Sequence, residues 1–303
     1  MPGQSRFPLP LIAAFFALYV IWGSTYLVIR IGVEYWPPLM LGGIRFVIAG
    51  GLMYAFLRWR GVPAPTWAQW KAAGMIGILL LSCGNGAVTV AEHSGVTSGV
   101  AALAVATVPL FTLLCGYFWG ARNTRLEWAG IMLGMIGIGM LNLGSNLQSS
   151  PLGAGLLLFA AAAWAFGSVW SKHLPLPQGA MASAAEMLVG GVVLLIGSAL
   201  SGERLEAVPP LEGWLALFYL IGFGSIIAFN AYMYLLKHVR PAAATSYAYV
   251  NPAVAVLLGI VFIGETIGIE EAVAMVVIIS AVVLIGLPQW RKSKSKVVVQ
   301  ESA

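Results

Sequence analysis

Long apolar segments dominate the chain and leave little sequence for any other kind of structure. A helix needs about 20 mostly apolar residues to cross a bilayer. Ten such runs lie at about residues 9–29, 38–57, 70–90, 97–119, 127–144, 153–171, 180–200, 213–236, 241–263 and 270–288. Only 9% of the 303 residues are charged, whereas a soluble domain carries roughly 25%. We therefore predict an all-α integral membrane protein with ten transmembrane helices, and exclude an ordinary soluble enzyme.

The positions of the basic residues predict the orientation, because cytoplasmic loops are enriched in Lys and Arg. With the N-terminus in the cytoplasm, Arg30 and Arg204 fall outside and Arg45 falls within the second run. The other basic residues fall inside: Arg6, Arg58, Arg60, Lys71, Arg122, Arg125, Lys172, Lys237, Arg240, Arg291, Lys292, Lys294 and Lys296. We therefore predict that both termini are cytoplasmic and that residues 289–303 form a basic cytoplasmic tail.

The two halves of the chain resemble each other. The matched positions, 143–145 residues apart, are Trp22-Gly23-Ser24 with Phe166-Gly167-Ser168, Gly77 with Gly222, Asn85 with Asn230, His93 with His238, and Pro109 with Pro252. Each half contains five predicted helices, an odd number, so the second half enters the membrane inverted. We predict two inverted five-helix repeats, at residues 9–144 and 153–288. Inverted repeats recur in secondary transporters, which bind substrate near the membrane midplane between the halves.

These motifs resemble the drug/metabolite transporter superfamily and its EamA-type branch. The shared features are the aromatic-Gly-Ser sequence in the first and sixth runs, Arg45 in the second, a proline in the fourth and ninth, and Gly264-Glu265 after the ninth. Gly120-Ala121 departs from the pattern, since the family often has Gly-Glu there. Within the family, the chain is most similar to YddG-type exporters of aromatic amino acids. The resemblance implies a bacterial cytoplasmic (inner) membrane location and the export direction, but the motifs are architectural and do not encode the substrate.

Two amides within the apolar runs are candidate substrate ligands. Asn85 and Asn230 occupy matching places in the repeat. An amide in hydrocarbon is costly unless it is hydrogen-bonded, so both side chains should face the protein interior. Either substrate contact or a hydrogen bond between helices satisfies that requirement.

Deep aromatic residues beside polar groups are further candidates for substrate binding. Trp22, Trp164 and Tyr247 lie farther from the predicted span ends than most tryptophans and tyrosines. Trp164 shares a helix face with Ser168, and Tyr247 shares one with Asn251. Such pairs can stack on a planar substrate and hydrogen-bond its polar atoms. Core packing or lipid contact is the alternative for each.

Prolines and ionisable residues within the runs suggest roles in the transport cycle. Pro109 and Pro252 each remove a backbone donor, which predicts either paired hinges or static kinks. Glu186 and His93 are candidates for proton coupling, and a surface or gate position is the alternative for His93. Arg45 is expected to tie helices together or to anchor at a lipid headgroup.

The predicted function is secondary transport by alternating access, with export of aromatic and other amino acids and related small metabolites. The alternatives are a multidrug efflux pump and an importer of another small metabolite, such as a nucleobase or sugar. No Gly-x-Ser-x-Gly or His-Glu-x-x-His motif occurs, so we do not expect an enzyme. We expect no cofactor, metal or nucleic-acid partner. The expected partners are the small-molecule substrate and the lipid bilayer, and the chain is expected to be a monomer or a weak homodimer.

Overall fold

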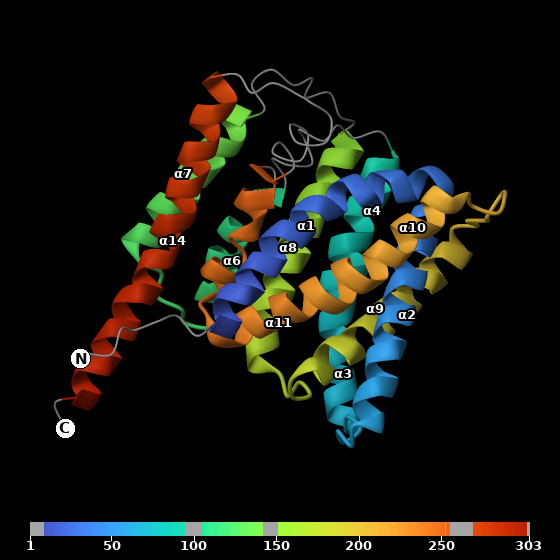
Figure 1. The fold of residues 1–303 in the computed structure, drawn as a ribbon, viewed down its shortest axis with the longest axis horizontal. Helices are drawn as coiled ribbons and strands as arrows, with labels where there is room; N and C mark the ends of the chain where they lie inside the picture. Colours follow the sequence, from blue (N-terminus) through green and yellow to red (C-terminus); the bar gives the residue numbers. More distant parts are fainter. Residues whose placement is uncertain (1–8, 95–104, 142–150, 252, 255–268, 302–303) are drawn as a thin grey trace.

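The computed structural model describes residues 9–94, 105–141, 151–251, 253–254 and 269–301, and every regular element in them is a helix (Figure 1). The first half contains α1 (Leu9–Tyr35), α2 (Pro38–Trp59), α3 (Trp67–Gly77), η1 (Ile78–Gly86), α4 (Ala87–His93), α6 (Val108–Tyr117) and α7 (Arg125–Leu141). The second half contains α8 (Pro151–Trp170), η2 (Ser171–His173), α9 (Ala180–Leu200), α10 (Leu211–Tyr219), η3 (Leu220–Ile227), α11 (Ala228–His238), α12 (Pro241–Ala244) and α14 (Ile269–Glu301).

Among the described residues, five helical stretches are long and apolar enough to cross a membrane, or six if the bent α1 is one span. The five are Pro38–Trp59, Trp67–Ala91, Leu152–His173, Ala180–Leu200 and Leu211–His238. The chain is therefore an all-helical membrane protein with at least five spans. The total of ten and the inverted arrangement stay predictions, because the runs 97–119 and 241–263 lie partly outside the described residues.

Helices of the first half pack mainly against helices of the second. The pairs are α2 with α9, α7 with α14, η1 and α6 with α8, and α1 with α10 and α11. Figure 1 shows α7 and α14 side by side along one edge of the molecule. The α14 helix continues to Glu301, so most of the predicted tail at 289–303 extends this helix.

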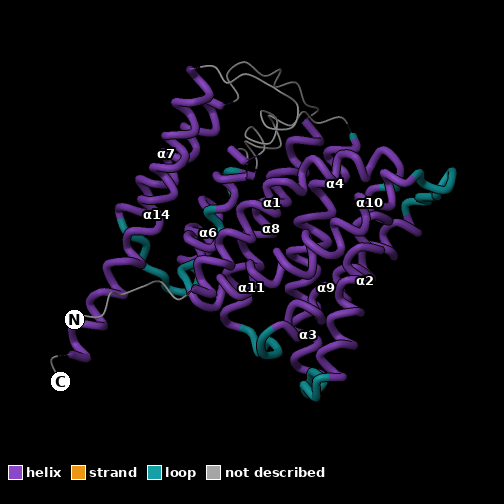
Figure 2. The backbone as a smooth tube through the Cα atoms, viewed as in Figure 1, coloured by secondary structure: helices purple, strands orange, loops and turns teal. Residues whose placement is uncertain are grey.

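Two spans contain a π-helical segment at nearly equivalent places, which the sequence does not predict. The runs 70–90 and 213–236 predict regular helices, whereas the structure inserts η1 between α3 and α4 and η3 between α10 and α11. Figure 2 draws every described regular element, these two included, as helix. Each segment contains two glycines, which weaken the regular helix. π-Helical turns are rare and occur frequently at functional sites.

The span containing α3 approaches α9 closely enough to exclude a side chain. A Cβ atom added to Gly77 would lie 2.2 Å from the carbonyl oxygen of Glu186. One added to Gly190, one turn farther along α9, would lie 2.7 Å from the carbonyl oxygen of Gly77. Small residues at helix interfaces permit this approach in membranes. The contact fixes η1, which follows Gly77, against the second half.

Candidate functional site

A cavity lies between helices of both halves. Its unfilled volume is about 740 Å³, which includes the part open to solvent. Five of the residues predicted to bind substrate line it: Trp22, Asn85, Trp164, Tyr247 and Asn251. They come from α1, η1, α8 and the helical residues after α12. The cavity therefore draws its lining from both repeats, as expected for a transporter with a site between its halves.

Four aromatic rings pack together beside the cavity, and we call them the aromatic cluster: Trp22, Trp164, Tyr232 and Tyr247. The Trp22 ring centroid lies 4.8 Å from that of Tyr247, 5.3 Å from that of Tyr232 and 5.6 Å from that of Trp164. Tyr232 is also 5.5 Å from Trp164 and 5.6 Å from Tyr247. These separations are typical of favourable edge-to-face and offset aromatic pairs. Three of the four rings, all but that of Tyr232, line the cavity and give it an aromatic wall.

A closed set of hydrogen bonds holds the aromatic cluster in place. Trp164 Nε1 donates to the Tyr232 hydroxyl at 3.0 Å, and that hydroxyl hydrogen-bonds with Ser168 Oγ. Ser168 Oγ donates in turn to the Trp164 carbonyl oxygen at 2.6 Å. Ser168 thus lies behind the cluster and supports it, outside the described cavity lining. Tyr232 is fully buried. The sequence does not identify it as a site residue, because the equivalent residue in the first half is Ala87, so no aromatic pair marks the position.

Replacing Tyr232 with phenylalanine should weaken substrate binding several-fold. The change keeps the ring but leaves Trp164 Nε1 without its acceptor, and a buried unsatisfied donor costs about 1–3 kcal/mol. The measurement is substrate affinity of the purified protein together with its melting temperature. Tyr234→Phe, on the same helix, is the matched control, because none of the described hydrogen bonds involves the Tyr234 hydroxyl. Equal effects of the two changes would contradict a supporting role for the Tyr232 hydroxyl.

Three polar side chains also face the cavity. Arg45 Nε donates to Ser225 Oγ of η3 at 2.9 Å, and the guanidinium carbon lies 4.4 Å from the Phe46 ring centroid. The side-chain oxygens of Asn85 and Asn251 are buried and accept no hydrogen bond from any described residue. The expectation that Arg45 only ties helices together or reaches a headgroup is therefore incomplete, because the residue lines the cavity. Its depth in the second run could not show which way it points.

Asn230 and Glu186 lie away from the described cavity lining. The Asn230 amide donates to the Ile226 carbonyl oxygen at 2.6 Å and lies 3.1 Å from Met53 Sδ. The contact with Met53, on α2, fits the alternative of a hydrogen bond between helices for Asn230. Glu186 is fully buried in α9, and neither carboxyl oxygen has a hydrogen-bond partner among the described residues.

The remaining predicted residues lie near segment ends. His93 is exposed at the end of α4. Pro109 lies in the first turn of α6, after a turn at residues 106–107. A proline is well tolerated there because the first amides of a helix have no intrahelical acceptor. Pro252 lies outside the described residues.

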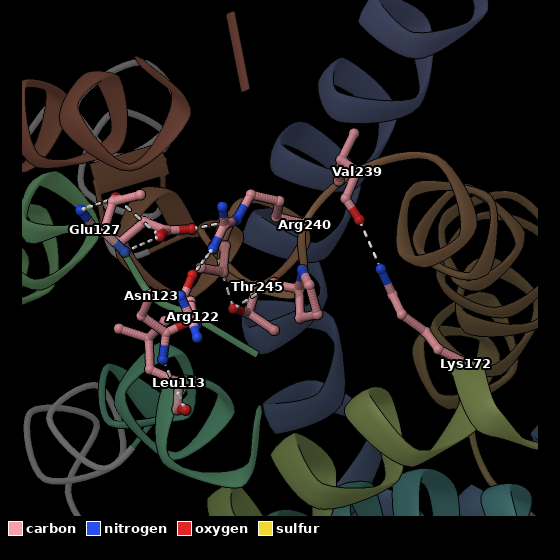
Figure 3. Close-up of polar contacts among 11 residues, drawn as sticks. Leu113, Arg122, Asn123, Glu127, Lys172, Val239, Arg240 and Thr245 are labelled. Atoms are coloured by element: carbon pink, nitrogen blue, oxygen red, sulfur yellow. Dashed lines mark hydrogen bonds and ion pairs between the residues drawn. The ribbon is translucent and has the colours of Figure 1, made fainter. Parts of the chain in front are cut away.

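Polar contacts join the two halves at the end of the bundle predicted to face the cytoplasm (Figure 3). We call the three residues that make them, Arg122, Glu127 and Arg240, the polar clasp. Glu127 Oε1 at the start of α7 lies 2.6 Å from Arg240 Nε, just before α12. Arg240 Nη2 also donates to the Arg122 carbonyl oxygen at 3.0 Å. Nearby, Lys172 Nζ donates to the Val239 carbonyl oxygen at 2.8 Å. The clasp therefore connects the loop before α7 with the turn between α11 and α12.

A model of the EamA-like transporter family matches the chain twice, at residues 9–143 and 151–287. The chain belongs to the EamA-like transporter family. The two matches suggest a duplicated repeat. An EamA-family chain is a membrane transporter and not an enzyme, as the sequence predicts.

Known relatives support the same assignment. The chain is 57% identical over 282 residues to "Uncharacterized inner membrane transporter YedA" of Escherichia coli (strain K12), covering 93% of this chain and 92% of the relative. It is 26% identical to a "Probable amino-acid metabolite efflux pump" of Salmonella typhimurium, covering 85% and 89%. A solved crystal structure shares the fold, with a TM-score of 0.74 at 21% identity, covering 92% of this chain and 97% of the other. This EamA-family chain is therefore a transporter of the inner membrane.

Proposed function

We propose that this transporter exports amino acids and related small metabolites by alternating access. The observation that carries the proposal is the cavity lined from both halves, with the aromatic cluster on one side and polar groups converging on it. Binding sites for small molecules are mostly apolar concave surfaces with a few placed polar groups. The related amino-acid metabolite efflux pump supports this substrate class.

The contacts around the cavity suggest how the two sides alternate. The lining extends through Ile29, Val88 and Leu157 toward the predicted outer ends of α1, α4 and α8. At the opposite end the halves meet through the polar clasp and through the Tyr19–Ser246 hydrogen bond of 2.6 Å. We assign this arrangement to a state closed toward the cytoplasm. Export then requires the clasp to open so that substrate can enter, with Pro109 and Pro252 as proposed hinges.

The lining chemistry disfavours a pump for cationic drugs. Among the described residues that line the cavity, Arg45 carries a positive charge and none carries a carboxylate. A cationic drug would meet repulsion without a compensating anion. A nucleobase can stack on the aromatic cluster, so its uptake must be measured beside that of the amino acids.

The test is uptake of radiolabelled substrates into proteoliposomes that contain the full chain. Saturable uptake of tryptophan and phenylalanine, competed by unlabelled amino acids, is the expected result. An imposed proton gradient then shows whether transport is coupled, which bears on the proposed roles of Glu186 and His93. Uptake of a nucleobase, sugar or cationic dye without any amino acid transport would overturn the proposal.

Removing the ion pair of the clasp should open the predicted cytoplasmic side more often. Glutamine at position 127 can keep the hydrogen bond that Thr124 N donates at 2.7 Å but loses the charge that faces Arg240. A partly exposed ion pair contributes roughly 0.2–1 kcal/mol, so Glu127→Gln should raise the open population up to about fivefold. The measurement uses a variant in which Cys83 and Cys115 are replaced by serine and Ser246 by cysteine. The rate at which a thiol reagent labels this new cysteine reports how often the cytoplasmic side opens.

Glu206→Gln is the control for this experiment, because Glu206 is exposed at the other end of the bundle. It should leave the labelling rate unchanged. If Glu127→Gln also leaves the rate unchanged, the clasp does not hold the cytoplasmic side closed.

A further inference from the structure

Arg45 is a buried cation whose hydrogen-bonding capacity is mostly unused. The residue is 5% exposed and lies on a helix that is long and apolar enough to cross a membrane. A guanidinium has five N–H donors, and Arg45 uses only Nε, which donates to Ser225, in the described contacts. The terminal nitrogens make no hydrogen bond to a described residue, although the side chain lines the cavity.

Arg45 also lacks a countercharge within the part of the chain that the structure describes. The ion pair found there, Glu127 with Arg240, lies at the clasp, and no described lining residue is acidic. A buried charge in a membrane protein is costly unless it is paired. The Phe46 ring, 4.4 Å from the guanidinium carbon, offsets only part of that cost. An anionic ligand in the cavity would supply the missing charge.

The guanidinium lies at the edge of the aromatic cluster. Gly224 of η3 shows this, because a Cβ atom added to it would lie 3.8 Å from Arg45 Nη2. The carbonyl oxygen of the same glycine accepts the hydrogen bond from Trp22 Nε1 at 3.0 Å. Gly224 therefore accepts a hydrogen bond from Trp22 and lies next to the guanidinium of Arg45. A ligand that packs on Trp22 has a cationic group within reach.

The other unused polar atoms of the cavity have the opposite character. The side-chain oxygens of Asn85 and Asn251 are buried acceptors without a described donor. Asn251 is 1% exposed, and both residues line the cavity. An ammonium group, with three donors and no acceptor, matches such oxygens. The cavity thus combines donors for an anion, acceptors for a cation and an aromatic wall.

We infer that Arg45 binds the carboxylate of the substrate, while Asn85 and Asn251 accept hydrogen bonds from its ammonium group. The side chain of the substrate packs on the aromatic cluster. Arginine suits this role because its planar group can bind a carboxylate through two parallel hydrogen bonds. The inference rests on the proposed function and narrows it: the site selects free amino acids over amines that lack the carboxylate.

The test compares tryptophan with tryptamine, which keeps the ring and the ammonium group but has no carboxylate. Binding of both is measured by isothermal titration to the purified full chain. The wild-type protein should prefer tryptophan at least tenfold. In Arg45→Gln this preference should fall to near one, because tryptophan loses its partner whereas tryptamine loses none. The ratio cancels any general damage to the cavity.

Two further variants keep the test decisive. Ser225→Ala removes the partner of Arg45 Nε but leaves the terminal nitrogens, so the preference for tryptophan should persist. Arg45→Lys keeps the charge without the paired donors and should lower the preference several-fold, which provides a readout if Arg45→Gln does not fold. An unchanged preference in the Arg45 variants would overturn the inference and leave amino acid transport standing. A wild-type protein that binds neither tryptophan nor another amino acid would overturn the proposed function itself.

Discussion

Replacing Trp164 with alanine is expected to reduce amino acid uptake more than tenfold. Trp164 lines the cavity and packs against Trp22 and Tyr232 at 5.6 and 5.5 Å between ring centroids. Its loss removes one wall of the site and the donor to the Tyr232 hydroxyl, so the remaining rings lose their support. In protein cores the loss of a packed aromatic side chain lowers the free energy of unfolding by about 3–5 kcal/mol. A substrate that packs on the ring loses contacts of the same kind, and a loss of about 1.4 kcal/mol in binding free energy already weakens binding tenfold.

The comparison that isolates the site uses two other tryptophan changes. Trp164→Phe keeps an aromatic wall and should retain more transport than the alanine variant. Trp59→Ala removes a ring that is 80% exposed at the end of α2 and should leave uptake near the wild-type value. Uptake is measured in proteoliposomes at matched protein content. If Trp164→Ala keeps full uptake activity, the aromatic cluster is not part of the substrate-binding site.

The sequence identifies cavity-lining residues where a polar or aromatic side chain stands out from the apolar residues of a membrane span. Asn85 and Asn251 are amides in apolar surroundings, and such groups must find a polar environment. Trp22, Trp164 and Tyr247 are too deep to belong to the interfacial belts of aromatic residues. These features depend on the position of a residue along its own helix, which the sequence provides directly.

The sequence fails where the outcome depends on contacts between helices. Repeat symmetry treats Asn85 and Asn230 alike, yet Asn85 lines the cavity and the Asn230 amide contacts Met53 Sδ of α2. A cavity that extends toward one end cannot present both repeats equally. Tyr232 and Arg45 acquire their positions from packing against α8 and η3. The π-helical segments have no sequence signal beyond their glycines.

Adding a methyl group at Gly77 is expected to destabilise the protein by roughly 1–3 kcal/mol, the usual cost of overpacking. The new Cβ atom would lie 2.2 Å from the Glu186 carbonyl oxygen, and the obstacle is backbone rather than a flexible side chain. Relief requires α3 and α9 to separate, which also displaces η1 and the cavity residues Gly84 and Asn85 that it carries. Gly77→Ala should therefore lower both the melting temperature in detergent and substrate affinity.

Repeat symmetry provides the matched control, because Gly222 is the equivalent of Gly77 in the second half. A Cβ atom at Gly222 would meet nothing within 4 Å. Alanine is favoured over glycine in helices by about 1 kcal/mol, so Gly222→Ala should leave the melting temperature unchanged or raise it slightly. The two substitutions are chemically identical. Gly77 ends α3 and meets α9, whereas Gly222 lies in η3 and meets no neighbouring atom. Equal melting temperatures for the two variants would mean that α3 and α9 are not held at the distance the structure gives.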